Sequence, residues 1–368
     1  MKRNYYLLFI TGVLLFSCSK DTKKSELPEY PVDIEQNISL PLSEIAEKTT
    51  AIELELTDVS LINPDRIQSI FLCDNLVIVA ERERIFVFGI DGKFVRTIGS
   101  KGQGPGEYSS IRNVAMDERN KRLFINSMSK IICYDLNGFF LKELPMGSDM
   151  IIKDLNYIDG KLLIAAEQIG RKDEKGQFNH SAVYRLNDDL QIIDSCTIQN
   201  TYFERPMSSI HPYENFILDG NGTIYIYYSD IYFNMQTPKE VVLRDTLYYL
   251  KNNHLIPGLK LKFNNDGIDG GGNKFIHLFN IYRSTRYIFA FYQNENKQMF
   301  YYYCYDTETN KGYNMQDGYI DDIHQIEKRV RIYPLNTNTE MFYYWHTHMN
   351  PNDLEEPNPT LYIGKLKK

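Results

Sequence analysis

Residues 74–98, DNLVIVAERERIFVFGIDGKFVRTI, decide the fold because they alternate three apolar strands with two turns. The pattern returns at residues 120–144 as NKRLFINSMSKIICYDLNGFFLKEL, which aligns with the first copy almost without gaps. Looser copies begin near Asp159, Asn221, Arg286 and Glu340. Repeats of roughly 40 to 65 residues with three or four strands are typical of propeller blades, whose sheets bury both faces only against neighbours. The six copies predict an all-β, six-bladed β-propeller.

Apolar runs and turn residues support the strands within each copy. Residues 85–88 and 131–134 are continuously apolar or aromatic, as in strands buried between neighbouring sheets. Asp91-Gly92 and Asn137-Gly138 stand where tight hairpin turns demand a positive φ. The 28 tyrosines and 20 phenylalanines supply broad side chains for the wedges between blades.

One strand stands outside the repeats. Residues 51–56, AIELEL, alternate like a half-buried strand and precede the first full copy, while the last strand, residues 359–366, ends the chain. We expect Ala51–Leu56 to pair into the last blade, so that the first and last segments close the ring. Such closure removes an exposed sheet edge that invites aggregation.

The N-terminus predicts export and a lipid anchor. Residues 1–18, MKRNYYLLFITGVLLFSC, carry two basic residues and an apolar run too short to span a membrane, as in a secretion signal. Leu15 to Cys18 resembles the lipobox of bacterial lipoproteins, which implies that Cys18 bears the lipid; an ordinary signal peptide with an incidental cysteine is the alternative. We therefore expect a signal peptide at 1–17, a flexible tether at 18–36 and a propeller domain at 37–368.

Charge and cysteine content exclude several classes of protein. The net charge of −7 argues against binding of polyanions, so nucleic acid is not an expected partner. The four remaining cysteines are widely spaced and form no C-x-x-C pair; they are Cys73, Cys133, Cys196 and Cys304. They are interpreted as small buried hydrophobes. We expect no metal and no cofactor, and contact with a membrane only through the lipid.

Residues 85–107, IFVFGIDGKFVRTIGSKGQGPGE, and the later KIICYDLNG resemble the NHL-type repeat. More closely, the chain resembles the six-bladed β-propeller lipoproteins of Bacteroidetes, in the glycine loop at 102–108 and in the closing GYIDDI and NPTLYIGKLKK. The resemblance implies a ring at the outer membrane, facing the periplasm or the cell surface, and no established catalytic activity.

Three segments carry candidate chemistry, and each has a plainer alternative. The glycines at 102–106 could suggest a phosphate cradle, but no helix and no Lys-Ser/Thr pair follows, so a linker between blades is favoured. Residues 345–348, WHTH, place two imidazoles on one side of a strand, for a metal or simply at a rim. The acidic residues at 317–322 lack the spacing of a calcium loop and are interpreted as a solvated loop.

Polar residues at the inner ends of the opening strands are the candidate ligand contacts, because propeller loops converge on the central channel. They are Arg112, Asn113, His211, His277 and Asn280. Their mixed donors suit a hydroxyl-rich or peptide ligand. The sequence favours a binding or scaffold protein for a glycan, a peptide or an envelope protein, with no catalytic residue assigned. A hydrolase or lyase with a channel-facing active site is the alternative; it would gather a histidine with arginine, tyrosine or carboxylates in one pocket.

Overall fold

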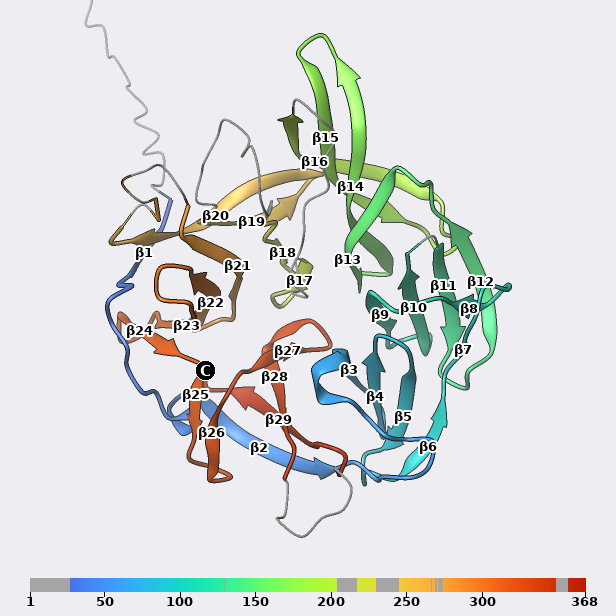
Figure 1. Ribbon diagram of the computed structural model, residues 1–368, viewed down its shortest axis with the longest axis horizontal. Helices are drawn as coiled ribbons and strands as arrows, with labels where there is room; N and C mark the ends of the chain where they lie inside the picture. Colours follow the sequence, from blue (N-terminus) through green and yellow to red (C-terminus); the bar gives the residue numbers. More distant parts are fainter. Residues whose placement is uncertain are drawn as a thin grey trace, which may run out of the picture.

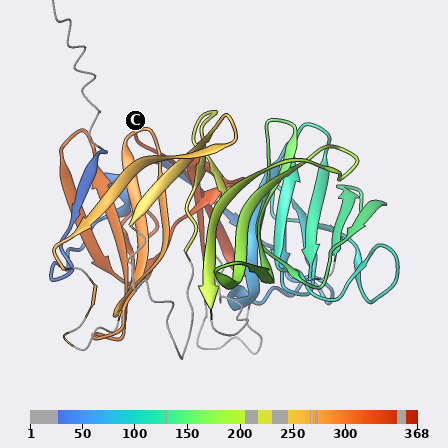
Figure 2. The same ribbon diagram turned by 90° about the horizontal axis from the view of Figure 1, so that it is seen from above.

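The chain folds into sheets arranged like the blades of a propeller (Figure 1). The computed structural model describes residues 27–348 and 357–368, apart from residue 129 and residues 204–216, 230–244, 266, 269 and 271–273. Within these residues the only helices are two short 3-10 turns, η1 (Leu42–Glu44) and η2 (Pro64–Arg66). The view turned by 90° shows that most strands run between the two broad faces of the molecule (Figure 2). The predicted all-β, propeller-like architecture is confirmed.

Four sheets each contain four antiparallel strands in chain order. The first has β3 (Ile67–Cys73), β4 (Leu76–Glu81), β5 (Ile85–Gly89) and β6 (Phe94–Thr97). The second has β9 (Asn113–Asp117), β10 (Arg122–Ser127), β11 (Lys130–Asp135) and β12 (Phe140–Pro145). The third has β13 (Met150–Ile158), β14 (Lys161–Asp173), β15 (Gly176–Leu186) and β16 (Ile192–Phe203). The fourth has β21 (Ile276–Arg283), β22 (Tyr287–Asn294), β23 (Met299–Asp306) and β24 (Lys311–Gln316).

The six predicted copies would give six separate sheets, but the remaining strands do not form two further separate four-stranded sheets. Nine of them form a single sheet in the order β1-β20-β19-β18-β17-β28-β29-β2, with β27 beside β28. Their bounds are β1 (Glu29–Val32), β2 (Ala46–Glu53), β17 (Ile217–Asp219), β18 (Ile224–Ile226), β19 (Thr246–Lys251), β20 (His254–Phe263), β27 (Tyr333–Leu335), β28 (Asn338–His346) and β29 (Thr360–Leu366). The two halves of this sheet meet only where β17 and β28 pair in parallel, at Asp219 and Asn338. Two-stranded pairs complete the described strands: β7 (Ser100–Lys101) with β8 (Glu107–Tyr108), and β25 (Tyr319–Asp321) with β26 (Ile326–Val330).

The strand predicted to enter the last blade, β2, pairs with the last strand of the chain, β29. β2 runs antiparallel to β29, with Ala51 opposite Tyr362. The strand covers 46–53, so the expected bounds of 51–56 lay a few residues too far along the chain. Ile52 and Leu54 of this segment are buried against the neighbouring sheets.

Residues 29–34 were expected in the flexible tether, and this expectation is wrong. β1 lies parallel to β20, with Tyr30 opposite Leu261. Val32 and Ile34 are buried in the apolar cluster between β20 and the fourth sheet. Two apolar side chains in a mostly polar stretch are enough to bind it to the fold, because each buried aliphatic side chain contributes about 1.5–3 kcal/mol.

The core lies in the wedges between sheets. Ile78 and Val87 of the first sheet pack with Leu123 and Ile132 of the second, so the strands that are apolar throughout are buried on both faces as predicted. All four described cysteines are free and buried, which confirms that they act as small apolar side chains. Burial raises the pKa of the Cys133 thiol to about 11. Within the described residues, no helix is both long and apolar enough to cross a membrane.

The glycine loop links the first sheet to the second. Gly106 has a φ of 70°, which favours glycine, and its backbone N donates to Glu143 at 3.0 Å. Lys130 donates to the carbonyl oxygen of Gly104 at 2.8 Å. Glu143 and Lys130 both belong to the second sheet, so side chains of that sheet hold the loop that leads into it.

Candidate functional site

The tip of one hairpin lies near the centre of the molecule and contacts several sheets. The turn between β27 and β28 projects into the centre (Figure 1). There Asn336 bonds to the backbone of Leu72 on β3, and Thr337 donates to Asn156 on β13 at 3.1 Å. The backbone N of Asp219 on β17 donates to the carbonyl oxygen of Thr337 at 3.1 Å. One turn therefore joins three inner strands, β3, β13 and β17.

A narrow cleft lies between the fourth sheet, the β27–β28 hairpin and β3. Its cavity volume is about 30 Å³, room for roughly two water molecules. Most side chains at its walls are aromatic rings, joined by two amides, one guanidinium and three aliphatic side chains. They include Gln68, Asn280, Tyr282, Phe291, Tyr302, Tyr303, Arg331, Tyr333 and Tyr343.

Arg331 lies between two aromatic columns in this cleft. Its guanidinium carbon is 3.9 Å from the centre of the Phe291 ring and 4.5 Å from that of Tyr333. Phe291 stacks on Tyr302 at 4.7 Å, which forms the column from the fourth sheet. The faces of aromatic rings attract a cation, and the contact strengthens where water is excluded. Packing between the rings therefore fixes the position of the positive charge in the cleft.

The second column ends at the only tryptophan of the chain. Tyr333 stacks on Trp345 at 5.1 Å with the rings 16° apart, and Tyr333 also stacks on Tyr343 at 5.4 Å. Tyr333 and Trp345 are both half-buried, so part of this column faces solvent beside the cleft. The emission of Trp345 is thus a built-in reporter of events at the cleft.

The two amides of the cleft stand at irregularities of their strands. The pairing of β3 with β4 shifts between Ile67 and Ser69, which leaves Gln68 as the extra residue. The pairing of β21 with β22 shifts between Leu278 and Asn280. Bulges of this kind redirect side chains. They explain why two polar amides meet in a cleft whose other walls are mostly aromatic.

Of the four predicted contact residues that the structure describes, one lines the cleft. Asn280 lines it, at 3% exposure. Asn113 donates to the backbone of Lys153 at 3.2 Å, so it links two inner strands. His277 lies 3.3 Å from Glu295 at the start of β21. Arg112 is exposed where β9 begins.

Two of the assigned residues lie outside the described part of the chain. They are His211, expected at the channel, and Cys18, expected to carry the lipid. The sequence reasoning also missed Arg331 and Gln68. Arg112 was selected as a polar residue just before an inner strand. The same rule would have selected Arg331 if Tyr333–Leu335 had been recognised as an inner strand.

The histidine pair at 346 and 348 forms, but without the surroundings of a metal centre. The two rings are 4.6 Å apart, although β28 ends at His346 and His348 lies just beyond it. The Nε2 of His348 lies 2.9 Å from the hydroxyl of Tyr362, and burial is the main cause that lowers the pKa of His346. Within the described residues, no three His, Cys, Asp or Glu side chains are grouped so as to hold a metal ion.

The acidic loop at 317–322 is not simply solvated, as its plainer interpretation had it. Asp321 is buried and accepts from the Tyr344 hydroxyl at 2.6 Å and from the His324 backbone at 2.9 Å. Asp322 accepts from the backbone N of Ser43 at 2.9 Å. These carboxylates fix the loop to β28 and to the N-terminal segment, because buried acceptors require donors.

Comparison with known proteins assigns the chain to a family and supports the fold. A family model described as "Domain of unknown function (DUF4934)" matches residues 28–367. The structure is similar to the crystal structure of a Bacteroides fragilis protein assigned as exported, with a TM-score of 0.64 and 17% identity over 92% of this chain and 100% of that chain. A Bacteroides caccae protein of unknown function gives a TM-score of 0.40 and 12% identity over 77% of this chain and 88% of that chain. A search of curated proteins found no match.

Proposed function

This chain belongs to the DUF4934 family, and we propose that it is an exported β-propeller binding module whose ligand is hydroxyl-rich, as a glycan is. The observation that carries the proposal is the position of Arg331 between two aromatic columns, beside the amides of Gln68 and Asn280. Ring faces with a few convergent donors and acceptors are typical of small-molecule sites.

The size of the cleft limits how the ligand enters. A cavity of about 30 Å³ accepts a hydroxyl group and not a whole sugar ring. The rest of the ligand therefore lies outside, against the half-buried faces of Tyr333 and Trp345. A peptide or an envelope protein remains the second class of partner, to be separated by the experiment below.

The composition of the cleft supports binding over catalysis. The alternative, a hydrolase or lyase, requires a general acid or base close to the reacting bond. Of the described residues at the cleft wall, none is a histidine or a carboxylate. The guanidinium and the amides can orient a ligand but are poor proton carriers near neutral pH. Tyrosine hydroxyls also line the cleft, but burial raises the pKa of Tyr303 and of Tyr319 further above neutral pH.

Six blades and a closed ring remain part of the proposal, together with the NHL-like character of the repeats. The nine-stranded sheet would count as two blades, β17–β20 and β27–β28–β29–β2, joined by the single pair of Asp219 and Asn338. The pairing of β2 with β29 supports closure by the N-terminal strand.

We also propose that the protein is tethered to the outer membrane through Cys18, facing the periplasm or the cell surface. The division becomes a signal at 1–17, a tether from 18 to about 28 and the propeller domain beyond it, since β1 starts at Glu29. A single chain of lipid holds a protein weakly and further acylation strengthens the hold. Cys18→Ser is expected to release the protein from the membrane fraction; retention of the correctly cleaved variant there would refute the anchor.

Emission of Trp345 tests the proposed ligand class. Arrays of neutral and acidic glycans and of peptides are screened against the soluble mature protein, and each hit is titrated while tryptophan emission is followed. A glycan that shifts the emission, and whose affinity falls about tenfold in Gln68→Ala and Asn280→Ala, supports the site. The matched control is Gln177→Ala on the β14–β15 hairpin. Hits confined to peptides, or affinities equal in all variants, would contradict the proposal.

A further inference from the structure

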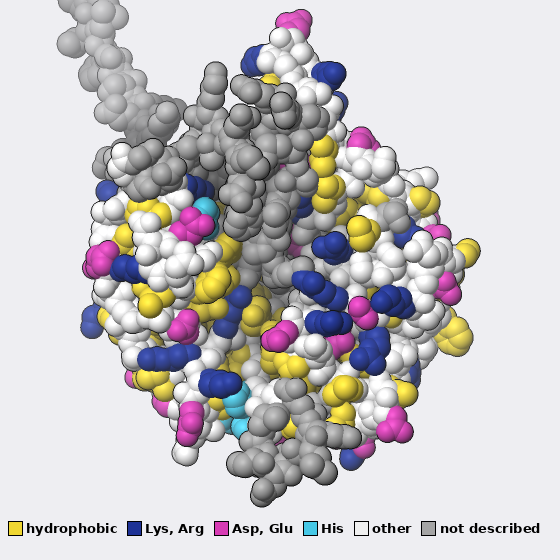
Figure 3. All heavy atoms as spheres, viewed as in Figure 1, with side chains coloured by type: hydrophobic (Ala, Val, Ile, Leu, Met, Phe, Trp, Pro, Cys, Tyr) yellow, Lys and Arg dark blue, Asp and Glu magenta, His cyan; other side chains and the backbone are white. Residues whose placement is uncertain are grey.

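Exposed basic side chains gather beside the cleft, over β3–β5 and β9–β10 (Figure 3). We call this surface the basic arc. It consists of Arg66, Arg82, Arg84, Lys101 and Arg112, all of them exposed. These residues stand just before β3 and β9, in the turn between β4 and β5, and in β7.

Hydrogen bonds place the backbone of the basic arc next to Gln68 of the cleft. Gln68, which lines the cleft, donates from its amide to the carbonyl oxygen of Arg66 at 3.3 Å. The backbone N of Arg82 donates to the same oxygen at 3.2 Å. The backbone N of Ile111, the neighbour of Arg112, donates to the carbonyl oxygen of Arg82 at 2.7 Å. Arg66 therefore stands two residues before Gln68, so the basic arc begins beside the cleft.

Two members of the basic arc, Arg66 and Lys101, share one carboxylate, that of Glu83. Glu83 is 3.6 Å from Arg66 and 3.4 Å from Lys101, but these side chains are about half exposed, and such pairs are weak. Glu81 is buried, and burial raises the pKa of its carboxyl. Arg112 carries no ion pair within the described part of the chain. The arc is thus a local excess of positive charge on a chain whose net charge is −7.

We propose that the ligand of the cleft carries carboxylate or sulfate groups that bind to the basic arc, as in an acidic oligosaccharide. This inference rests on the proposed function and narrows its substrate class. Guanidinium groups bind carboxylate and sulfate through two parallel hydrogen bonds, and a cluster of them favours an anion over its neutral counterpart. The small cleft suits a sugar hydroxyl better than the longer side chain of an acidic peptide.

A matched pair of probes tests the charge requirement. Oligogalacturonate and its fully methyl-esterified form share one sugar backbone, and each carboxylate of the first is an uncharged methyl ester in the second; heparin-derived oligosaccharide supplies sulfate. Binding to the soluble mature protein is measured by calorimetry and by Trp345 emission at 50 and 300 mM salt. We expect at least one acidic probe to bind about tenfold more tightly than the ester, and to weaken severalfold at the higher salt concentration.

Variants locate the effect. Arg66→Gln/Arg112→Gln is expected to remove most of the preference for the acidic probe while binding of the ester stays unchanged. Lys161→Gln/Lys175→Gln removes the same charge from exposed positions on the third sheet and should bind like the wild type. Both pairs leave the core intact, so folding is checked by the thermal transition alone.

The outcomes separate the inference from the proposed function. Equal affinity for acid and ester, with an emission change for both, would overturn the inference and leave the glycan proposal standing. Binding of the acidic probe that persists in Arg66→Gln/Arg112→Gln would also overturn it. Tighter binding of oligoglutamate or of single-stranded DNA than of any acidic glycan would assign the basic arc to another class of ligand. If the wild-type protein binds none of these probes and no glycan on the arrays, both proposals are wrong.

Discussion

Asn336 binds to Leu72 as a neighbouring strand would. Its Oδ1 accepts from the backbone N of Leu72 at 2.8 Å, and its Nδ2 donates to the carbonyl oxygen of Leu72 at 2.8 Å. Asn336 has a φ of 49°, in the left-handed region that asparagine tolerates better than most residues. One side chain thus attaches the tip of the β27–β28 hairpin to β3 and places Tyr333 and Arg331 next to Gln68.

Asn336→Ala is expected to lower the free energy of unfolding by about 1–3 kcal/mol, because two backbone groups of Leu72 lose their partner. Urea denaturation measures the change. Asn310→Ala is the control, since Asn310 also has a positive φ but lies in an exposed turn and makes no such bond across the ring. An equal loss in both variants would show that backbone strain alone is responsible.

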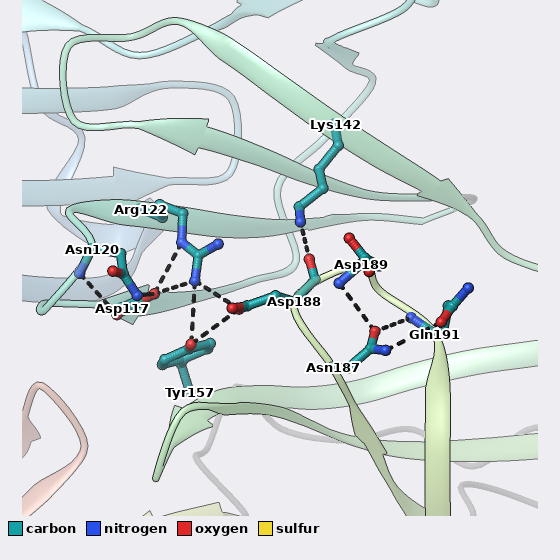
Figure 4. Close-up of polar contacts among 9 residues, drawn as sticks. All are labelled: Asp117, Asn120, Arg122, Lys142, Tyr157, Asn187, Asp188, Asp189 and Gln191. Atoms are coloured by element: carbon teal, nitrogen blue, oxygen red, sulfur yellow. Dashed lines mark hydrogen bonds and ion pairs between the residues drawn. The ribbon is translucent and has the colours of Figure 1, made fainter.

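Arg122 connects the second and third sheets (Figure 4). It donates to Asp117 at 3.0 Å, to Asp188 at 2.8 Å and to the Tyr157 hydroxyl at 3.2 Å. Arg122→Gln leaves the buried Asp117 carboxylate without a cation, although Asn120 still donates to it, and we expect a loss of about 3 kcal/mol in urea denaturation.

Arg185→Gln serves as the comparison for Arg122. Arg185 pairs with Asp194 at 3.1 Å within one sheet, and this pair is more exposed than that of Arg122 and Asp117. Its loss should cost about 0.5–1 kcal/mol. If the two substitutions lower the free energy of unfolding by the same amount, burial does not determine how much the Arg122 contact between sheets stabilises the protein.

Asp306 makes stability depend on pH. Hydrogen bonds from Arg286 are the main cause that lowers the pKa of Asp306 to about 2. A folded-state pKa below the unfolded value of 3.8 means that the stabilisation is fully present above about pH 5 and is lost as the pH falls through about 2. We expect the wild type to exceed Asp306→Asn by about 2 kcal/mol at pH 7 and by less at pH 3. A difference that stays constant with pH would contradict the ion pair.

The N-terminal strand is tested by two deletions. Removal of residues 1–57 takes away β2 and leaves β29 as an open edge, so we expect aggregation and a lower thermal transition. Removal of residues 1–36 takes away β1 but keeps β2, and isolates the contribution of the shorter strand. If the protein without residues 1–57 stays as soluble and heat-stable as the mature form, β2 does not close the ring.

Much of the fold was predictable because its signals are local. Continuous apolar runs such as Ile85–Phe88 are buried as expected. Turn pairs such as Asp91-Gly92 stand at hairpin ends, where Gly92 has a φ of 83°. The copies of this pattern predicted an all-β, propeller-like molecule, since each unit needs neighbours to cover its faces.

The candidate site was not predictable in the same way. Asn280 was selected and does line the cleft, but Gln68 and Arg331 come from segments more than 260 positions apart in the chain. Their meeting depends on two bulges and on a hairpin tip held by Asn336. Residues 29–34 were assigned to a tether because their few apolar side chains gave a weak pattern.

Sequence alone thus determined which segments are buried strands, where the hairpin turns lie, and that each sheet must pack against others. These signals are local, because apolar periodicity and turn chemistry involve residues close together in the chain. Only the tertiary structure decided that β2 pairs with β29 and that the tip of the β27–β28 hairpin binds to β3. It also decided that Arg331 lies between two aromatic columns. These contacts join segments far apart in the chain, and their formation depends on register and packing throughout the fold.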